Sequence, residues 1–252
     1  MNSETRQRIK NVMEAWVVSQ ASAQNRFDAD TIRQSYPFHQ LIFSIDEIML
    51  ARTERSIVTS MGDDLYPHIA LELARDRFQE VFIEYPIVGE ISDAALNMIE
   101  QIVTDLRAPS RGRRDRPRPN QANELNTILD LREGDPVQHS VIADLYIGDF
   151  DGGPLFVELK TPLPNLDIAA ESKRKMMYFL AIMDRRNVAG AKAFLGLTYN
   201  PFITRARYRH SFTSRIMDME NEVLIGSEFW DYIGGTGAYD ELLEIVAEIN
   251  PS

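Results

Sequence analysis

The sequence predicts an α/β protein, in the α+β sense, in which a mixed central sheet is flanked by helices and preceded by a largely helical N-terminal part. Two observations support this fold class. Residues 1–106 carry mostly apolar positions at helical spacing, whereas the second half contains short apolar runs typical of strands, separated by turns and one long helix. A chain of 252 residues is long enough for one large core. We therefore expect a single domain over 1–252.

The N-terminal part, about 1–106, is expected to be built mainly of helices. Apolar residues recur at helical spacing over 4–18. The stretch at 44–47, Ser-Ile-Asp-Glu, has the form of a capping box that opens a second helix, for which Gly62 is the expected stop. The other elements expected here are a helix over 65–79, a strand over 81–88 closed by Gly89, and a helix from Ser92 to about Leu106.

The second half is expected to hold the sheet and the catalytic core. A basic loop at 107–120 leads into this core, which covers about 121–215. Gly, Asp and Pro at 148–154 predict a tight turn, so the runs on either side should pair as an antiparallel hairpin. The expected elements are a helix over 122–131, strands over 141–147, 155–161 and 191–199, a long helix over about 166–185, and an acidic helical C-terminal part over 216–252.

The net charge of −11 argues at first against a nucleic-acid partner, because phosphates attract basic surfaces. However, most of this charge comes from nine acidic residues after Ile216, a segment that contains no Lys or Arg. The basic loop, in contrast, holds six arginines and one aspartate between 107 and 119. A protein that is acidic overall can still present a basic groove. The charge balance therefore leaves DNA binding open.

Other features of composition indicate the cellular compartment. The chain contains no cysteine, which excludes disulfides and thiolate metal sites. Its N-terminus carries charges where a signal peptide would be apolar. The apolar run at 176–183 is far too short to span a membrane. We expect a soluble cytoplasmic protein without a membrane partner.

The strongest candidate site is a charged strand face next to the hairpin turn. Strand alternation places Glu158 and Lys160 on the same face as Phe156, opposite the apolar side chains of this strand. In the partner strand Asp144 is expected to face away from the core. Three charged side chains would then converge beside the turn. The partner-strand residues expected to share the core face are Val141, Ala143, Leu145 and Ile147.

Two carboxylates and an ammonium on rigid strands suit phosphodiester hydrolysis. Carboxylate oxygens bind Mg²⁺, a hard cation that can activate a water and stabilise the leaving oxygen. The lysine would orient or deprotonate that water and offset negative charge in the transition state. The alternative is a half-solvated strand whose charged residues simply face water. Alternation along the strand does not separate these two interpretations.

Longer stretches favour the catalytic interpretation. The spacing of Asp144, Glu158 and Lys160 resembles the PD-(D/E)xK signature of nucleases, with Ala143 where the signature has proline. Four stretches also resemble, in the same order, type II restriction endonucleases of the TdeIII-like family. They lie at 51–62, 143–165, 197–202 and 223–245, and the resemblance spans roughly 45–248.

The resemblance implies a restriction-endonuclease-like core and Mg²⁺-dependent cleavage of double-stranded DNA at a short site, GGNCC-like in this family. It further implies a homodimer and a cognate DNA methyltransferase as a functional, not physical, partner. The metal ligands map onto Asp144, Glu158 and the carbonyl of Leu159, and the catalytic lysine onto Lys160. A further acid from an N-terminal helix is expected, with Glu54 as the first candidate and Glu72 as the second. A helix-surface salt bridge remains the alternative for both.

DNA contacts are expected from three basic groups. Lys173 and Arg174, on the long helix, are candidates for phosphate contacts, and a solvated helix face is the alternative. Three alternating arginines that would share one face of a strand are candidates for base recognition, or else belong to a charged edge strand. These are Arg205, Arg207 and Arg209. In the basic loop, Arg113 and Arg114 are expected at phosphates, or serve solubility.

The leading hypothesis is therefore a type II restriction endonuclease. One rival is a repair or recombination nuclease with the same core, which would recognise DNA structure and not sequence. The other is a non-catalytic DNA-binding or protein-assembly module, in which the acidic C-terminal helices dock a partner and the strand charges are only solvated.

Overall fold

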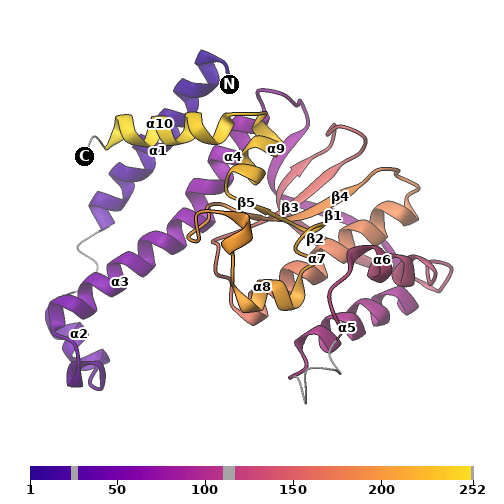
Figure 1. Ribbon diagram of the computed structural model, residues 1–252, viewed down its shortest axis with the longest axis horizontal. Helices are drawn as coiled ribbons and strands as arrows, with labels where there is room; N and C mark the ends of the chain where they lie inside the picture. The colour runs from indigo at the N-terminus through magenta and orange to yellow at the C-terminus, as the bar shows by residue number, and fades with distance from the viewer. Residues whose placement is uncertain (24–27, 110–116, 251–252) are drawn as a thin grey trace.

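The computed structural model describes residues 1–23, 28–109 and 117–250. Within them lies a five-stranded sheet in the order β1-β2-β3-β4-β5 (Figure 1). The pairs β1–β2 and β2–β3 are antiparallel, whereas the pairs β3–β4 and β4–β5 are parallel. This mixed sheet flanked by helices confirms the expected fold class. The strands are β1 Val81–Ser92, β2 Pro136–Ile147, β3 Leu155–Lys160, β4 Lys192–Leu197 and β5 Val223–Ile225.

Helices cover the sheet on both sides and enclose two hydrophobic cores. Strand β3 contributes to both, because Phe156 packs into the first core and Val157 into the second. The helices of the first core are α5 Asp93–Arg107, α6 Gln121–Leu129, α7 Leu166–Arg185 and α8 Ser211–Ile216. The helices of the second core are α1 Ser3–Ala23, α4 Tyr66–Ala74, α9 Ser227–Gly234 and α10 Ala238–Ile249. None of the helices in the described ranges is both long enough and apolar enough to cross a membrane.

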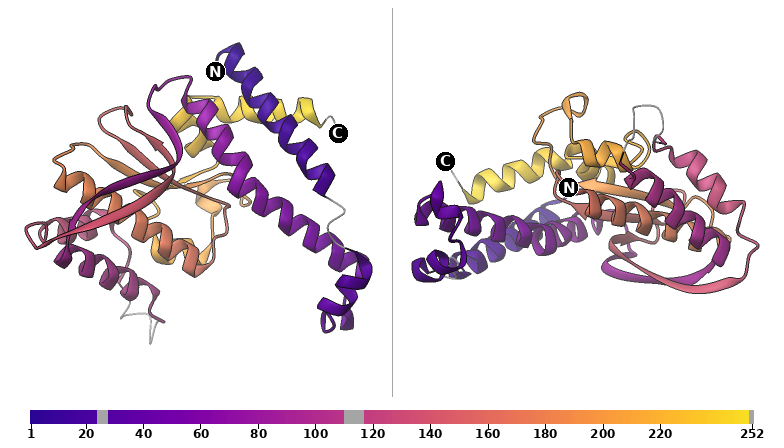
Figure 2. Two further views of the ribbon diagram at one scale, coloured as in Figure 1. Left: turned by 180° about the vertical axis from the view of Figure 1, so that it is seen from behind. Right: turned by 90° about the horizontal axis from the view of Figure 1, so that it is seen from below.

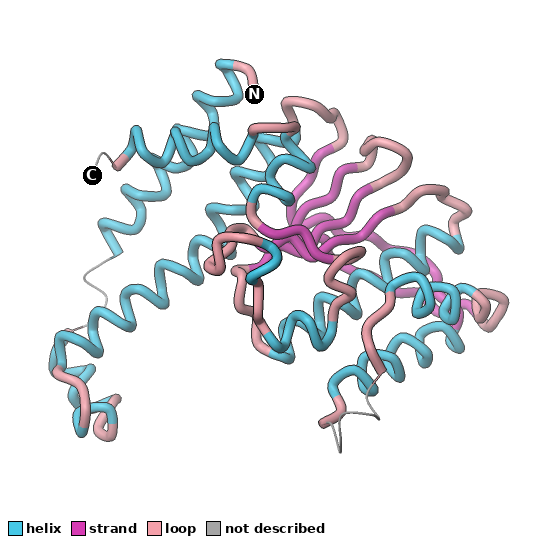
Figure 3. The backbone as a smooth tube through the Cα atoms, in the orientation of Figure 1, coloured by secondary structure: helices cyan, strands magenta, loops and turns pink. Residues whose placement is uncertain are grey.

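A helical arm projects from this body. It consists of α2 Ala29–Ser35, the 3₁₀ turn His39–Leu41 and α3 Ile45–Ser60, which extend away from the sheet in both views of Figure 2. The expected capping box is present, because Ser44 and Glu47 exchange side-chain and main-chain hydrogen bonds at the start of α3. In Figure 3 the outer end of this helical arm lies far from the strands, whereas the end of α3 approaches them.

Gly62 does not stop this helix, contrary to the expectation. The chain continues through a π-helical turn, Met61–Leu65, directly into α4. A π turn contains one more residue per hydrogen-bonded ring than an α-helical turn, so it absorbs the glycine without ending the helix. The expected helix over 65–79 ends earlier, at Ala74.

The long β1–β2 pair corrects the expected face of β2. Val141 and Ala143 lie in the first core, whereas Leu145 and Ile147 lie in the second, so the four residues do not share one face. The change of face coincides with Glu84 on the paired strand, whose positive φ of 49° interrupts regular strand geometry. Both strands are also longer than expected, and β1 runs through Gly89.

Candidate active site

The candidate site forms where β2 and β3 separate. These strands pair through Leu145–Ile147 and Leu155–Val157 only. Beyond that point the N–H of Leu159 donates to Asp144 Oδ2, at 2.8 Å, in place of a main-chain carbonyl of β2. The Asp144 carboxylate thus occupies the gap between the diverging strands, and its position is fixed by the backbone of the strand that carries Glu158 and Lys160.

The three residues expected to form the site do converge. Lys160 Nζ lies 2.6 Å from Asp144 Oδ2 and 3.3 Å from Glu158 Oε2. A second ammonium, that of Lys175 on α7, contacts Glu158 Oε1 and lies 3.9 Å from Asp144 Oδ1. Two lysines therefore flank the carboxylates of Asp144 and Glu158, and each lysine lies next to different oxygen atoms of these groups. Lys175 was missed in the sequence because nothing in the run 173–175 indicates which basic side chain points toward the sheet.

Burial separates this site from a solvated strand face. The Glu158 side chain is 1% exposed, because α7 covers the side of β3 that carries it. Burial raises the pKa of the Glu158 carboxyl, and the nearby Asp144 charge adds to this, while the two lysines oppose it. For Lys160, burial disfavours the ammonium, but the Glu158 and Asp144 carboxylates outweigh this and raise its pKa above the ordinary value. The half-solvated alternative is therefore wrong, and Lys160 is an ammonium in this arrangement.

A cavity of about 450 Å³ opens beside these residues. Asp144 and Lys160 line it from the sheet, and Glu84 lines it from β1. On the opposite side lie Thr59 and the π-helical turn, which contributes Asp63. The turn that replaces the expected helix stop thus brings a carboxylate to the site. The signal for it in the sequence was the pair of acidic residues directly after Gly62, immediately beyond the matching stretch 51–62.

The two acids expected from the N-terminal helices lie elsewhere. Glu54 is exposed on α3 and does not line the cavity. Glu72 forms ion pairs with Arg8 of α1 and Arg75, at 2.7 and 3.4 Å. For Glu72 the salt-bridge alternative is the one that the structure supports.

The oxygen donors of the site fit a magnesium-type ion. Among the described residues no group of three His, Cys, Asp or Glu is arranged to hold a metal by itself. A magnesium ion needs fewer than three protein ligands, because it keeps several waters and binds through one or two carboxylates together with substrate phosphates. Asp144 and Glu158 supply two carboxylates, and both face ammonium groups, which indicates that the space between them favours positive charge.

The structure contradicts the expected phosphate contact of Lys173. This side chain is fully buried between α7 and its neighbours, where Nζ lies 2.5 Å from both Glu222 Oε2 and Glu124 Oε2. A phosphate cannot reach it. Arg174 is partly exposed but is held by Glu100, at 2.7 Å, and by Glu171. Both residues therefore stabilise the packing of α7 as the structure stands.

The three alternating arginines do not lie on a strand, so that expectation was wrong. Arg205–Arg207 forms a 3₁₀ turn. Arg205 pairs with Glu228 and donates to the carbonyl of Val223 at 3.1 Å, which fixes the loop against the body. Arg207 and Arg209 are exposed. Arg113 and Arg114 lie outside the described residues.

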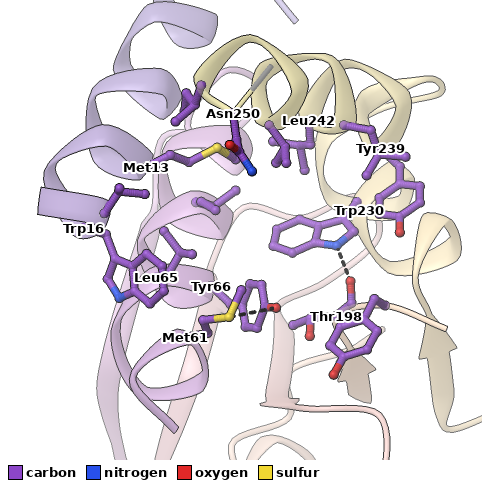
Figure 4. Close-up of a pocket in the computed structure, with 16 residues that line it drawn as sticks. Met13, Trp16, Met61, Leu65, Tyr66, Thr198, Trp230, Tyr239, Leu242 and Asn250 are labelled. Atoms are coloured by element: carbon purple, nitrogen blue, oxygen red, sulfur yellow. Dashed lines mark hydrogen bonds between the residues drawn. The ribbon is translucent and has the colours of Figure 1, made fainter. Parts of the chain in front are cut away.

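A second cavity, of about 310 Å³, lies between α1, α4, α9 and α10 (Figure 4). Its lining is apolar and aromatic, and none of the described residues that line it is charged. Trp230 closes one side and donates from Nε1 to the carbonyl of Thr198 at 2.8 Å. Without a carboxylate or an amine, this cavity has no groups for hydrolysis, so it is not a candidate active site.

Comparison with known proteins identifies the family. The family model "Type II restriction endonuclease, HinfI" matches residues 1–250. Type II restriction enzyme HgiBI of Herpetosiphon aurantiacus is 32% identical, with 99% of this chain and 94% of that protein aligned. HgiEI, from the same organism, is 31% identical over the same shares of the two chains. HgiCII is 29% identical, over 100% of this chain and 96% of its own length. No solved structure matches.

These matches confirm the class of enzyme that the sequence resembles, while the narrower likeness to the TdeIII-like family stays a prediction. The family match covers nearly the whole chain, including the sheet, both cores and the separation of β2 and β3. The chain therefore belongs to the HinfI family of type II restriction endonucleases, enzymes that hydrolyse DNA phosphodiester bonds at specific sites.

Proposed function

We propose that this enzyme cuts double-stranded DNA at a short site with Mg²⁺, leaving 5′-phosphate and 3′-hydroxyl ends, and that Asp144, Glu158 and Lys160 perform the reaction. The observation that carries the proposal is the convergence of these three side chains where β2 and β3 separate, beside a cavity of about 450 Å³. A solvated strand face does not bury a carboxylate against two ammonium groups.

Each residue has a role that follows from its contacts. Asp144 and Glu158, with the carbonyl of Leu159, would hold the ion, which when bound supplies an activated water and charge compensation at the phosphate. Lys160 contacts both carboxylates, at 2.6 Å from Asp144 and 3.3 Å from Glu158. Because its ammonium lies between the two carboxylates, we assign it the role of a positive charge that orients the phosphate or water and stabilises the transition state.

We further propose Asp63 as the acid from the N-terminal helices, in place of Glu54. Asp63 lines the same cavity as Asp144 and Lys160, whereas Glu54 does not. An exposed carboxylate facing the metal site can bind a water of the ion or the ion itself. The variant Asp63→Asn should therefore weaken cleavage, and Glu54→Gln should leave it near the wild-type level.

The finer properties of the reaction are expectations from the family resemblance. We propose a GGNCC-like recognition site, a homodimeric enzyme, a cytoplasmic location and a cognate DNA methyltransferase that protects the host. Of the basic residues considered for DNA contacts, Arg207 and Arg209 are exposed and remain our candidates. Their guanidinium groups have the geometry to bind guanine or phosphate.

The test is cleavage of unmethylated phage DNA with Mg²⁺. Wild-type protein should give discrete fragments, and Glu158→Ala and Lys160→Ala should reduce the rate by roughly 10²–10³-fold or more, as expected for loss of a group that stabilises the transition state. Lys10→Ala, a lysine far from the site that pairs with Glu248, is the matched control and should cut normally.

Other outcomes would support the rivals. Cutting of junctions or flaps only would indicate a repair nuclease. If no divalent metal supports cutting, and all the variants bind DNA as tightly as wild type, the catalytic proposal fails and a binding module is the better description.

A further inference from the structure

The helical arm carries a cluster of large apolar side chains that the described residues leave exposed. Phe38, Leu41 and Ile42 are each more than 80% exposed, and Phe43 and Leu50 are 49% and 70% exposed. Within the arm only the inner residues are buried, such as Ile32 and Ile48 where α2 meets α3. We call residues 36–50 the arm tip. It lies at the end of the arm farthest from the sheet (Figure 1).

The arm tip exposes more apolar surface than a monomer normally does. Taking about 180 Å² for each fully exposed side chain of this size, the five residues leave roughly 600–700 Å² of apolar surface in contact with water. The largest patch on a typical monomer is roughly 300–600 Å² and is often functional. Chain segments that remain folded with this much exposed apolar surface generally bind another protein.

Charge also sets the arm tip apart. Over residues 36–45 the sequence reads YPFHQLIFSI, in which His39 is the only side chain that can carry charge. The full chain has a charged fraction of 26%. Depletion of charged residues at an aromatic and aliphatic centre is typical of the core of a protein interface. It is unsuited to DNA, whose phosphates bind basic surfaces.

We propose that the arm tip is the dimerisation surface of this enzyme, and that its occupant is the arm tip of a second copy. In a two-fold dimer the same patch faces itself, so both sides need the same chemistry. An apolar patch centred on residues 36–45, which contain no Asp, Glu, Lys or Arg, satisfies this without complementary charges. Two such patches would bury roughly 1,200–1,400 Å², which lies in the range of stable interfaces.

The arm also connects the interface to the site. α3 runs from the arm tip without a break into the π-helical turn that contributes Asp63 to the active-site cavity. The interface therefore fixes the distance between two active sites through a pair of rigid helices. This consequence rests on the proposed function, because two sites at a fixed distance allow both DNA strands to be cut, whereas the association itself does not depend on it.

The test is the mass of the protein in solution, without DNA or metal, by sedimentation and by light scattering at micromolar concentration. Wild type should have twice the 28.8 kDa of one chain. The double variant Leu41→Asp, Ile42→Asp should have the mass of one chain with an unchanged circular dichroism spectrum, since both side chains are exposed. The control is Ile203→Asp, an isoleucine that is 81% exposed, like Ile42, but lies far from the arm in the sequence, and it should remain a dimer.

A wild-type protein with the mass of one chain overturns the proposal, and so does a double variant that remains a dimer. A second readout uses supercoiled plasmid containing one site. Wild type should give linear DNA, and the monomeric variant should give mainly nicked circles. If no protein cuts the plasmid, the proposed function fails, but the masses still decide whether the arm tip is the interface.

Discussion

Lys173 provides a sharp test of how the structure corrects the expected DNA contacts. The sequence predicts that this lysine contacts a phosphate, whereas the structure places its side chain in a buried ion cluster. Its ammonium is 0% exposed and lies 2.5 Å from carboxylate oxygens of Glu222 and Glu124, which are themselves largely buried. The perturbation is Lys173→Met, which keeps most of the volume and removes the charge. It leaves Glu222 buried without a cation.

The expected loss of stability follows from that burial. Removing one partner of a buried ion pair costs about 3–5 kcal/mol, because the remaining charge is uncompensated. For a chain of this size this corresponds to a fall in Tm of roughly 6–20 °C. Adding Glu222→Gln should recover a large part of the loss, because it removes the buried carboxylate. Its amide oxygen can still accept the hydrogen bond that the N–H of Asp218 donates to Glu222, at 2.7 Å.

The assay is urea unfolding followed by circular dichroism for wild type, both single variants and the double variant. This double-mutant cycle measures the coupling between Lys173 and Glu222. DNA affinity, measured at a temperature where every variant is folded, should be unchanged in Lys173→Met, as should its dependence on salt. The reasoning is refuted if Lys173→Met unfolds like wild type and instead binds DNA weakly with a reduced salt slope, which is the signature of a lost phosphate contact.

Three further predictions concern a turn, an acid and the second lysine. Gly190→Ala should lower the unfolding free energy by at least about 2 kcal/mol, because at φ +72° a Cβ would overlap the main-chain oxygen of Gly152. Gly62→Ala, where a Cβ meets no atom closer than 3.9 Å, is the control for urea unfolding. Asp149→Asn should lose at most about 1 kcal/mol, since the group is exposed. The main-chain N–H groups of residues 79 and 80 lower the pKa of Asp149. The loss of stability in the variant should therefore be present at neutral pH and vanish as the pH falls below about 4. A loss of stability that does not depend on pH would contradict this prediction. Lys175→Met should raise the affinity for Mg²⁺ about tenfold in calorimetric titration, because the Lys175 ammonium contacts an active-site carboxylate and competes with the ion for it. An unchanged affinity would show that the ammonium does not compete with the ion.

The candidate site could be predicted from the sequence because it depends on local rules. Alternation along a short strand places Glu158 and Lys160 on one face, and a Gly-rich turn brings Asp144 opposite them within the same hairpin. The capping box at Ser44 and the cap at Ser92 are likewise encoded within a few residues. Such features need no knowledge of the rest of the fold.

What could not be predicted depends on long-range packing. Lys173 and Lys175 are two residues apart on one helix, yet the first faces α6 and Glu222 while the second faces Glu158. Only the position of α7 against the sheet decides between them. Arg205 was expected at DNA because alternating arginines suggest a strand, but its partners Glu228 and Val223 come from the C-terminal part over 216–252, and no local pattern indicates that contact. The face change at Glu84 has no recognisable residue pattern either.

The π-helical turn between α3 and α4 has a consequence for how this enzyme can vary. Each residue of an α-helix rotates the following chain by about 100°. Losing one residue from Met61–Leu65 would convert the turn to a regular α-helix and swing the arm around the axis of α4 by roughly that angle. The helix α3 itself contributes to neither hydrophobic core, and the turn contributes only Met61 and Leu65 to the second one. A single insertion or deletion at this turn is therefore enough to point the arm in a new direction.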